Sequence, residues 1–161
     1  MSRTVVAALA VAGLVVCTDV IFAQSQTEQE VRQTIIEGYD YNATHLQGQP
    51  YSYSQHGALE FWSSGGLLQE ISPTGRPDEF DSFNVRPKHI TVTALIEGQV
   101  AMAHFYAEGS MQPKGSAAVS NYLVRVTQVY VKEGDAWKIR SAHWSQVLGG
   151  AGTSQSGQIT P

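Results

Sequence analysis

The sequence predicts a single α+β domain in which N-terminal helices cover one face of an antiparallel sheet. Apolar residues recur at helical spacing between residues 27 and 46, and they alternate with polar residues at strand spacing from residue 89 onward. A helical segment followed by consecutive strands is typical of the α+β class, in which helices pack on one face of the sheet. The length of 161 residues and a hydrophobic content of 42% suit one domain with its own core.

The charge balance argues against two classes of partner. The sequence has 10 Lys and Arg residues and 14 Asp and Glu residues, a net charge of −4. Nucleic-acid binding depends on clustered cations that neutralise phosphates, and attachment to an anionic membrane surface depends on a polybasic patch. Because no such cluster occurs in the sequence, we expect neither partner.

The N-terminus resembles a secretory signal. Met1 to Arg3 is a short basic start, and Val5 to Cys17 is an uninterrupted apolar run of 13 residues. A membrane span needs about 20 residues, whereas a signal-peptide core has the shorter length. We therefore expect residues 1–23 to be removed after Ala23 and the mature protein to be periplasmic or secreted. Lipidation of Cys17 is the alternative.

The mature chain is expected to begin with an amphipathic helix and to end with a tail. Thr27 and Glu30 have the spacing of a capping box, and Gly48 and Pro50 end the helical pattern near Leu46. The buried stripe of this helix contains Val31, Ile35, Tyr39 and Ala43. We expect the domain to span residues 24–148 and residues 149–161, rich in Gly, Ser, Thr and Gln, to be disordered.

The middle of the chain is less regular. Tyr51 to Trp62 and Pro77 to Phe83 are each predicted as a short helix, with a short strand at Leu67 to Ile71 between them. Four long strands are then predicted, at His89 to Ile96, Gln99 to Ser110, Ala118 to Val131 and Ala136 to Val147.

The last hairpin can be given a register. A two-residue turn at Gly134-Asp135 pairs Val131 with Lys138 and Arg125 with Trp144. One face of the hairpin would then hold Arg125, Thr127, Arg140 and Trp144, and the other Tyr130, Trp137 and Ile139. Because both faces carry large apolar groups, we expect the helices to cover one face and a second subunit, or a pocket, to use the other. A pocket is expected on the face of Arg125, and a homodimer interface on the face of Tyr130, Trp137 and Ile139.

The same hairpin, Arg125 to Val147, resembles the end of the nuclear-transport-factor-2-like superfamily, in particular its SnoaL-like and ketosteroid-isomerase-like members. The residues that carry the resemblance are Arg125, Thr127, the Gly134-Asp135 turn, Trp137, His143 and Ser145. The resemblance implies a cone-shaped curved antiparallel sheet wrapped around N-terminal helices, with a pocket at the open end. It also implies a dimer through the outer face of the sheet.

The catalytic groups of the isomerase members do not transfer well to this sequence. The place of the carboxylate base falls near Trp62, with Glu60 the closest carboxylate, and the place of the oxyanion-binding Asp falls on Thr127. Trp144 matches a pocket tryptophan of the family. The expected ligand-binding residues are therefore Tyr39, Trp62, Arg125, Thr127, Arg140 and Trp144.

Three functions stay open on the sequence alone. The first is an exported domain that binds a small molecule, apolar or anionic, in an aromatic pocket that the arginines would make cationic. The second is an isomerase, cyclase or hydrolase that uses His143, His104 or Glu60. The third is a dimerisation or interaction module. No cofactor is expected, and no metal, because the 5 His residues lack the spacing of a metal motif.

Overall fold

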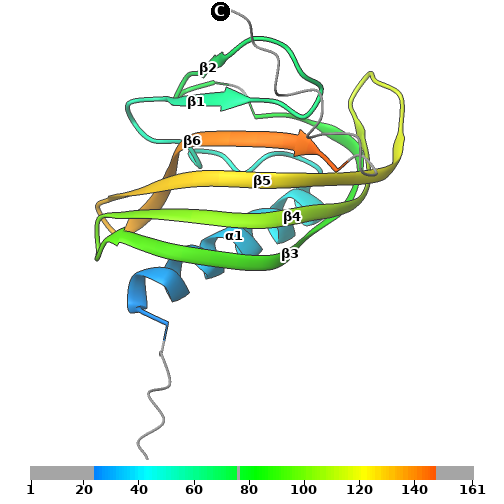
Figure 1. Ribbon diagram of the computed structural model, residues 1–161. Helices are drawn as coiled ribbons and strands as arrows, with labels where there is room; N and C mark the ends of the chain where they lie inside the picture. Colours follow the sequence, from blue (N-terminus) through cyan, green and yellow to red (C-terminus); the bar gives the residue numbers. More distant parts are fainter. Residues whose placement is uncertain (1–23, 76, 148–161) are drawn as a thin grey trace, which may run out of the picture.

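The computed structural model describes residues 24–75 and 77–147 (Figure 1). The expected signal peptide and the expected tail therefore lie outside the described residues. The elements in chain order are α1 (Gln26–His45), β1 (Ala58–Phe61), β2 (Gln69–Ile71), β3 (Phe80–Ile96), β4 (Val100–Pro113), β5 (Val119–Glu133) and β6 (Ala136–Gln146).

The strands form one sheet in the order β2-β1-β6-β5-β4-β3. All neighbours are antiparallel except β1, which runs parallel to β6 and makes the sheet mixed. Helix α1 lies behind β3 and β4 in Figure 1 and contacts β3, β4 and β6. The α+β prediction is confirmed, with one helix rather than several among the described residues. None of the described helical residues forms a segment long and apolar enough to cross a membrane.

The prediction of two short helices in the middle of the chain is wrong. The segment before β1 instead lies along β6 between turns at residues 50–51 and 55–56, because Ser54 N–H donates to the Ile139 carbonyl at 2.9 Å and Ile139 N–H donates to the Ser52 carbonyl at 2.9 Å. The second segment enters strand β3 at Phe80, which pairs with Pro113. In both places, hydrogen bonds to distant strands override the local preference.

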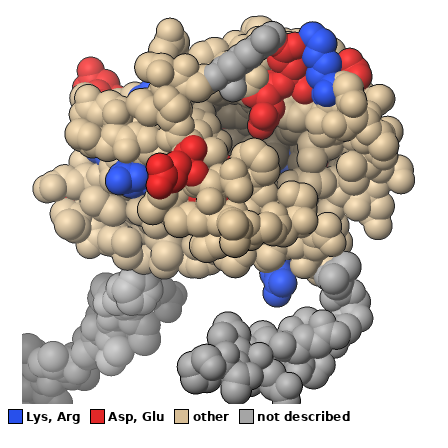
Figure 2. Space-filling model, turned by 90° about the horizontal axis from the view of Figure 1, so that it is seen from above, with Lys and Arg blue, Asp and Glu red and all other residues tan. Residues whose placement is uncertain are grey.

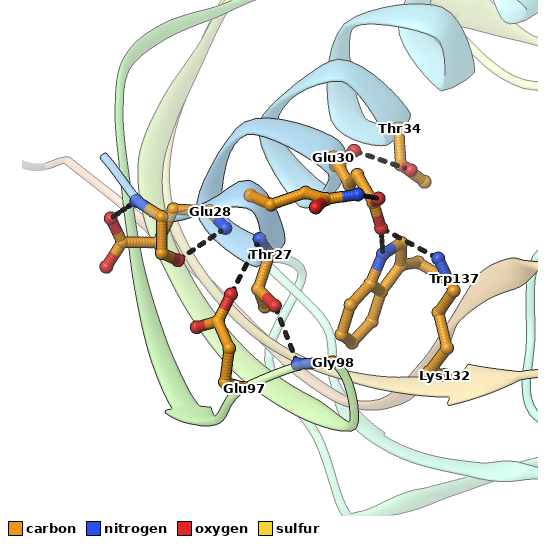
Figure 3. Close-up of polar contacts among 10 residues, drawn as sticks. Thr27, Glu28, Glu30, Thr34, Glu97, Gly98, Lys132 and Trp137 are labelled. Atoms are coloured by element: carbon orange, nitrogen blue, oxygen red, sulfur yellow. Dashed lines mark hydrogen bonds and ion pairs between the residues drawn. The ribbon is translucent and has the colours of Figure 1, made fainter. Parts of the chain in front are cut away.

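Helix α1 begins one residue earlier than predicted and has a different cap. The capping box joins Ser25 and Glu28: Glu28 N–H donates to Ser25 Oγ at 3.2 Å, and Ser25 N–H donates to Glu28 Oε2 at 3.1 Å. The predicted pair, Thr27 and Glu30, is used for tertiary contacts instead (Figure 3). Ser25 with Glu28 and Thr27 with Glu30 have the same spacing and similar side chains, so the sequence pattern alone does not distinguish the capping pair from the other pair.

These tertiary contacts form what we call the helix-start network. Thr27 N–H donates to Glu97 Oε1 at 3.1 Å, and the N–H of Gly98 donates to Thr27 Oγ1 at 2.7 Å. Glu30 Oε2 accepts from Trp137 Nε1 at 2.8 Å and from Lys132 Nζ at 2.7 Å. The members of the network are Thr27, Glu30, Glu97, Gly98, Lys132 and Trp137 (Figure 3). They attach the first turn of α1 to the β3–β4 turn and to the β5–β6 hairpin.

The core lies between α1 and the concave face of the sheet. Val31 and Ile35 of the helix are buried against Val92, Ala103 and Phe105 of the sheet, in one cluster of apolar side chains. Tyr39, one turn further along, meets the Phe105 ring edge-on with centroids 6.1 Å apart. The predicted apolar stripe of the helix is thus confirmed at these three positions.

Irregularities in three strand pairs curve the sheet. The register shifts between Lys88 and Thr91 in the β3–β4 pair, between Gly109 and Met111 in the β4–β5 pair, and between Val129 and Tyr130 in the β5–β6 pair. Such bulges bend strands and increase their twist. Gly109 is required at its bulge, since its φ is 145° and an added Cβ would lie 2.0 Å from the Asn84 carbonyl oxygen. The curvature leaves part of the concave face beyond the reach of the single helix.

Candidate functional site

A cavity of about 1780 Å³ occupies this uncovered part of the concave face. Its walls come from one side of α1, from residues 48–53, from β1 and from the inner faces of β5 and β6. Figure 2 looks onto this end of the molecule, where acidic side chains gather beside a hollow. All 3 Trp residues of the sequence, Trp62, Trp137 and Trp144, contribute to the walls.

Strand β1 places a carboxylate in this cavity. Burial alternates along the strand, so that Ala58 and Glu60 face inward while Leu59 and Phe61 face outward. Pairing with β2 on one side and with β6 on the other, where Glu60 is opposite Ala142, holds the strand in this register. Glu60 is consequently only 3% exposed although it lines the cavity.

The Glu60 carboxyl group is incompletely satisfied. Trp62 Nε1 donates to Oε2 at 3.1 Å, whereas Oε1 has no hydrogen-bond partner of good geometry among the described residues. Burial raises the pKa of Glu60 above its usual value, and nearby Asp78 adds to the effect. The Trp62 and Tyr53 side chains oppose it by stabilising the ionised form. A buried carboxyl oxygen without a donor is costly unless something else supplies one.

Tyr53 lies beside Glu60 because its segment runs along β6. Tyr53 forms a parallel bridge with Ile139, and its neighbour Ser54 donates from Oγ to Glu133 Oε1 at 2.6 Å. Burial raises the pKa of Tyr53, and the Glu60 carboxylate raises it further. The phenol therefore stays protonated and can act as a hydrogen-bond donor.

A second unsatisfied oxygen opens on the same cavity. The hydroxyl of Tyr39 is buried and has no hydrogen-bond partner within the described part of the chain, and burial raises its pKa. The nearby Tyr130 hydroxyl, by contrast, donates to Gln128 Oε1 at 2.7 Å. Unsatisfied buried polar atoms are rare in folded proteins, and two in one cavity indicate a place for a polar ligand group or for ordered water.

The charge of the described cavity wall is negative. Seven acidic side chains and three lysines contribute to it. Each lysine is engaged: Lys132 with Glu30, Lys114 with Glu79, and Lys138 with the Tyr51 carbonyl. Among the described residues, no lysine or arginine forms an ion pair with Glu60, and no group of His, Cys, Asp and Glu side chains is arranged to hold a metal ion.

The structure brings together half of the predicted ligand-binding residues. Tyr39, Trp62 and Trp144 line the cavity. Arg125 and Thr127 instead lie on the outer face of β5, where they pair with Ser145 and His143 of β6. The predicted pairing of Arg125 with Trp144 is wrong.

The physical reason is a bulge in β6. Tyr130 pairs with Ile139 and Val129 pairs with Ser141, which leaves Arg140 as an extra residue between them. One inserted residue shifts every later pair by one and reverses the faces of β6 relative to β5 beyond that point. The Arg140 guanidinium turns away to donate to the Gly57 carbonyl at 3.1 Å. The expectation of a cationic pocket formed by Arg125 and Arg140 is therefore not met.

The faces assigned to the pocket and to the interface are also exchanged. Tyr130, Trp137 and Ile139, expected at a dimer interface, lie on the concave face with the core or the cavity. His104 and His143, candidate catalytic bases, are exposed on the outer face, on either side of Thr127. They lie on the opposite side of the sheet from Glu60.

Sequence reasoning missed Tyr53 as a cavity residue and assigned Gln128 and Tyr130 to the wrong face. The alternation of β5 did group Gln128 with Tyr130, but the hairpin alone could not show which side faced the helix. For Tyr53 the sequence offers no local signal, because its position depends on a bridge to a strand 86 residues later. Glu60 was recognised only through the family resemblance.

Comparison with known proteins supports the fold. A scan of protein-family models and a search of curated proteins found no match to this chain. Similar solved structures include a putative calcium/calmodulin-dependent protein kinase II association domain from Xanthomonas campestris, with 16% identity, a TM-score of 0.53, and coverage of 79% of this chain and 94% of that one. An uncharacterised protein with a cystatin-like fold from Caulobacter vibrioides has 11% identity, a TM-score of 0.51, and coverage of 80% and 95%.

An NTF2-like protein of unknown function from Pseudomonas putida is also similar, with 20% identity, a TM-score of 0.49, and coverage of 73% and 84%. The curved, open sheet that packs around an N-terminal helix is the cone that the terminal hairpin led us to expect, with one helix in place of several and a mixed in place of an antiparallel sheet. The helix and sheet topology, together with the two structures whose TM-scores exceed 0.5, shows an α+β cone fold. At these identities the similarity defines the fold and leaves function to the site.

Proposed function

We propose that the protein binds a small, partly apolar molecule in the cavity and that the polar end of this molecule donates a hydrogen bond to Glu60. One observation carries the proposal: Glu60 is 3% exposed, lines the cavity, and has a carboxyl oxygen, Oε1, without a hydrogen-bond partner of good geometry among the described residues. Ligand sites are typically apolar concavities with a few polar groups that orient the ligand. The aromatic walls and the buried carboxyl group match that description.

The test compares a variant that removes the polar group with one that leaves the cavity alone. Glu60→Met keeps a similar shape but cannot accept a hydrogen bond. Glu108→Met changes an exposed carboxylate on the outer face, whose ion-pair partner Lys88 is 3.7 Å away. A thermal-shift screen of small aromatic compounds with amine, hydroxyl or carboxylate ends identifies binders, and calorimetry then gives their affinities.

We expect Glu60→Met to weaken binding by about 1.5–3 kcal/mol, the usual contribution of a hydrogen bond to a charged group. Glu108→Met should bind like wild type. Tryptophan fluorescence checks occupancy, because the only Trp residues in the sequence lie in the cavity walls. Binders whose affinity is the same in wild type and Glu60→Met would contradict the proposal.

Catalysis by Glu60 is the second candidate function. Its raised pKa would suit a general acid or base that works near neutral pH, with the Tyr53 phenol as a neighbouring donor. An identified binder that is chemically converted by wild type, and not by Glu60→Gln, would establish an enzyme. Unchanged binder after prolonged incubation would leave the protein a binding domain.

We also propose self-association through the outer face of the sheet. Large apolar side chains are exposed there, with Leu59 at 40%, Phe61 at 47% and Tyr106 at 42%. Sedimentation equilibrium should show a homodimer that Tyr106→Lys weakens. Thr44→Lys, which adds the same single positive charge at an exposed position of α1, is the control. A monomer at high concentration would refute this proposal.

Export is proposed from the sequence pattern alone. Mass spectrometry of the protein from its native cells should show a mature chain that starts at Gln24, or within two residues of it. A form that retains the apolar run up to Cys17 would refute cleavage, and a lipid on Cys17 would establish the lipoprotein alternative.

A further inference from the structure

We propose that the preferred occupant of the cavity is an organic cation: a molecule with an apolar body and a primary or secondary ammonium group that contacts Glu60. The inference rests on the proposed binding function and specifies its ligand class. It reverses the charge that the sequence led us to expect, because the arginines that suggested an anion lie on the other face of the sheet or bond elsewhere.

The first argument is the charge of the wall. Glu60 is almost fully buried, and no described lysine or arginine forms an ion pair with it. Glu70 and Asp78 also line the cavity without such a pair among the described residues. A buried carboxylate is stable only when a cation or several donors compensate for its lost hydration. An ammonium group supplies both charge and N–H donors to the unsatisfied Oε1, whereas an anion would be repelled.

The second argument is the aromatic surface around the carboxyl group. Trp62 donates to Glu60 Oε2 through its indole N–H, Tyr53 interacts with the same carboxyl group, and Tyr39 and Trp144 line the same cavity. Aromatic faces attract cations through the ring quadrupole, and they also cover the apolar body of such a ligand. A buried carboxylate with aromatic neighbours is thus a combination that recognises an amine better than a neutral alcohol.

The third argument concerns how the affinity for an ammonium ligand should depend on pH. Burial and the Asp78 charge raise the pKa of Glu60, and the Trp62 and Tyr53 donors lower it. An ammonium ion favours the ionised form, so its binding should release a proton below the raised pKa and become tighter as pH rises through it. A neutral donor would bind the protonated form at least as well.

The experiment uses three compounds that share a phenethyl group: phenethylammonium, phenethyl alcohol and phenylpropionate. Calorimetry measures their affinity for wild type, Glu60→Gln, Glu60→Met and the outer-face control Glu108→Gln. Glu60→Gln keeps a hydrogen-bond acceptor of the same shape and removes only the charge. Urea unfolding of each variant confirms that it is folded before binding is compared.

We expect wild type to prefer phenethylammonium to the alcohol by about tenfold, which corresponds to about 1.4 kcal/mol. That preference should disappear in Glu60→Gln and persist in Glu108→Gln. In wild type the affinity for the ammonium should rise with pH, with proton release on binding, and the rise should be lost in Glu60→Gln. The pH series on wild type needs no variant and therefore stands even if a substitution unfolds the protein.

Equal or tighter binding of the alcohol or of phenylpropionate, with an affinity that Glu60→Met lowers, would overturn the cation proposal and leave the binding function intact. Binding that neither Glu60→Gln nor Glu60→Met alters would overturn both. An ammonium preference that persists in Glu60→Gln would also overturn the inference, because the selective charge would then lie elsewhere on the wall.

Discussion

The two ends of helix α1 treat their polar groups in opposite ways. At the first turn, the Thr27 hydroxyl accepts from Gly98 N–H, and the Glu30 carboxylate accepts from both Trp137 and Lys132. Beyond the middle of the helix, the Tyr39 hydroxyl is buried without a partner among the described residues, and it opens on a cavity where Glu60 Oε1 also lacks a hydrogen-bond partner of good geometry. The first region satisfies these polar groups within the chain, and the second leaves two oxygens unsatisfied among the described residues.

This contrast distinguishes polar groups that stabilise the fold from polar groups that are available for binding. A satisfied network contributes to folding, so that removing one member leaves another buried group unpaired. An unsatisfied group reduces stability, and proteins retain such groups where function needs them. The same kind of substitution should therefore have opposite consequences in the two regions.

Among changes in the helix-start network, Thr27→Val is expected to cause the largest loss in the free energy of unfolding. Valine has the same shape, but it cannot accept the hydrogen bond from Gly98 N–H at a position only 2% exposed. We expect a loss of about 1–3 kcal/mol in the free energy of unfolding, measured in urea. Thr44→Val, at an exposed position of the same helix, should cost far less. Equal losses would mean that the network contributes no more than a surface contact.

Glu30→Gln should be the next most damaging change at neutral pH. Hydrogen bonds from Lys132 and Trp137 lower the pKa of Glu30 to about 2, so the carboxylate contributes stability above its unfolded pKa. That contribution is lost as pH falls from the usual value of 4.5 toward 2. Urea unfolding across this range should show a smaller acid-dependent loss in Glu30→Gln than in wild type. Parallel pH curves would contradict this account.

Glu60 should contribute to stability with a pH dependence opposite to that of Glu30, and Glu60→Gln tests this. Burial raises the pKa of Glu60, so its contribution to stability is present at low pH and is lost as pH rises through the raised pKa. The variant should therefore be at least as stable as wild type at neutral pH, with a higher midpoint of thermal unfolding. A lower midpoint would show that the ionised carboxylate is satisfied in the folded protein and would remove the basis of the contrast.

The smallest effect on stability is expected from Tyr39→Phe. Its hydroxyl has no partner in the described residues, so its removal should change the free energy of unfolding by no more than about 0.5 kcal/mol. Tyr130→Phe is the matched control, because it breaks a 2.7 Å hydrogen bond to buried Gln128 and should cost about 1–3 kcal/mol. Equal losses in the free energy of unfolding would mean that the hydroxyls of Tyr39 and Tyr130 are equally well hydrogen-bonded, which would contradict the contrast.

Sequence patterns were most informative where structure depends on near neighbours. The helix was predicted at residues 27–46 and is observed at Gln26–His45, and the last strand was predicted to within one residue of Ala136–Gln146. Both elements have a period that a short window shows. The cap was misplaced because two overlapping polar pairs satisfy the same pattern, and only the contacts with Gly98 and Trp137 distinguish them.

The site was predicted less well for two reasons. The extra residue Arg140 reverses the faces of β6 beyond it relative to β5, and no turn rule predicts a bulge five residues beyond a turn. The hairpin also does not show which face of β5 meets the helix, so Arg125 and Thr127 were assigned to the wrong face. Tyr39, Trp62 and Trp144 were identified as cavity residues from helix periodicity and from family resemblance. Glu60 and Tyr53 depend on pairing across about 80 residues of chain, which local patterns do not contain.

The parallel pairing of β1 with β6 has a consequence for the order of assembly. Glu60 is held opposite Ala142, so closing this contact requires almost the whole domain to be in place. Contacts between residues distant in sequence form late, because closing the long loop between them loses chain entropy before the stabilising interactions of the contact can form. The hairpins of β3 to β6 can form from neighbouring segments, whereas the cavity gains its carboxylate only when the last strand is complete. A chain interrupted before β6 during synthesis would retain the helix and most of the sheet, yet have no means of placing Glu60.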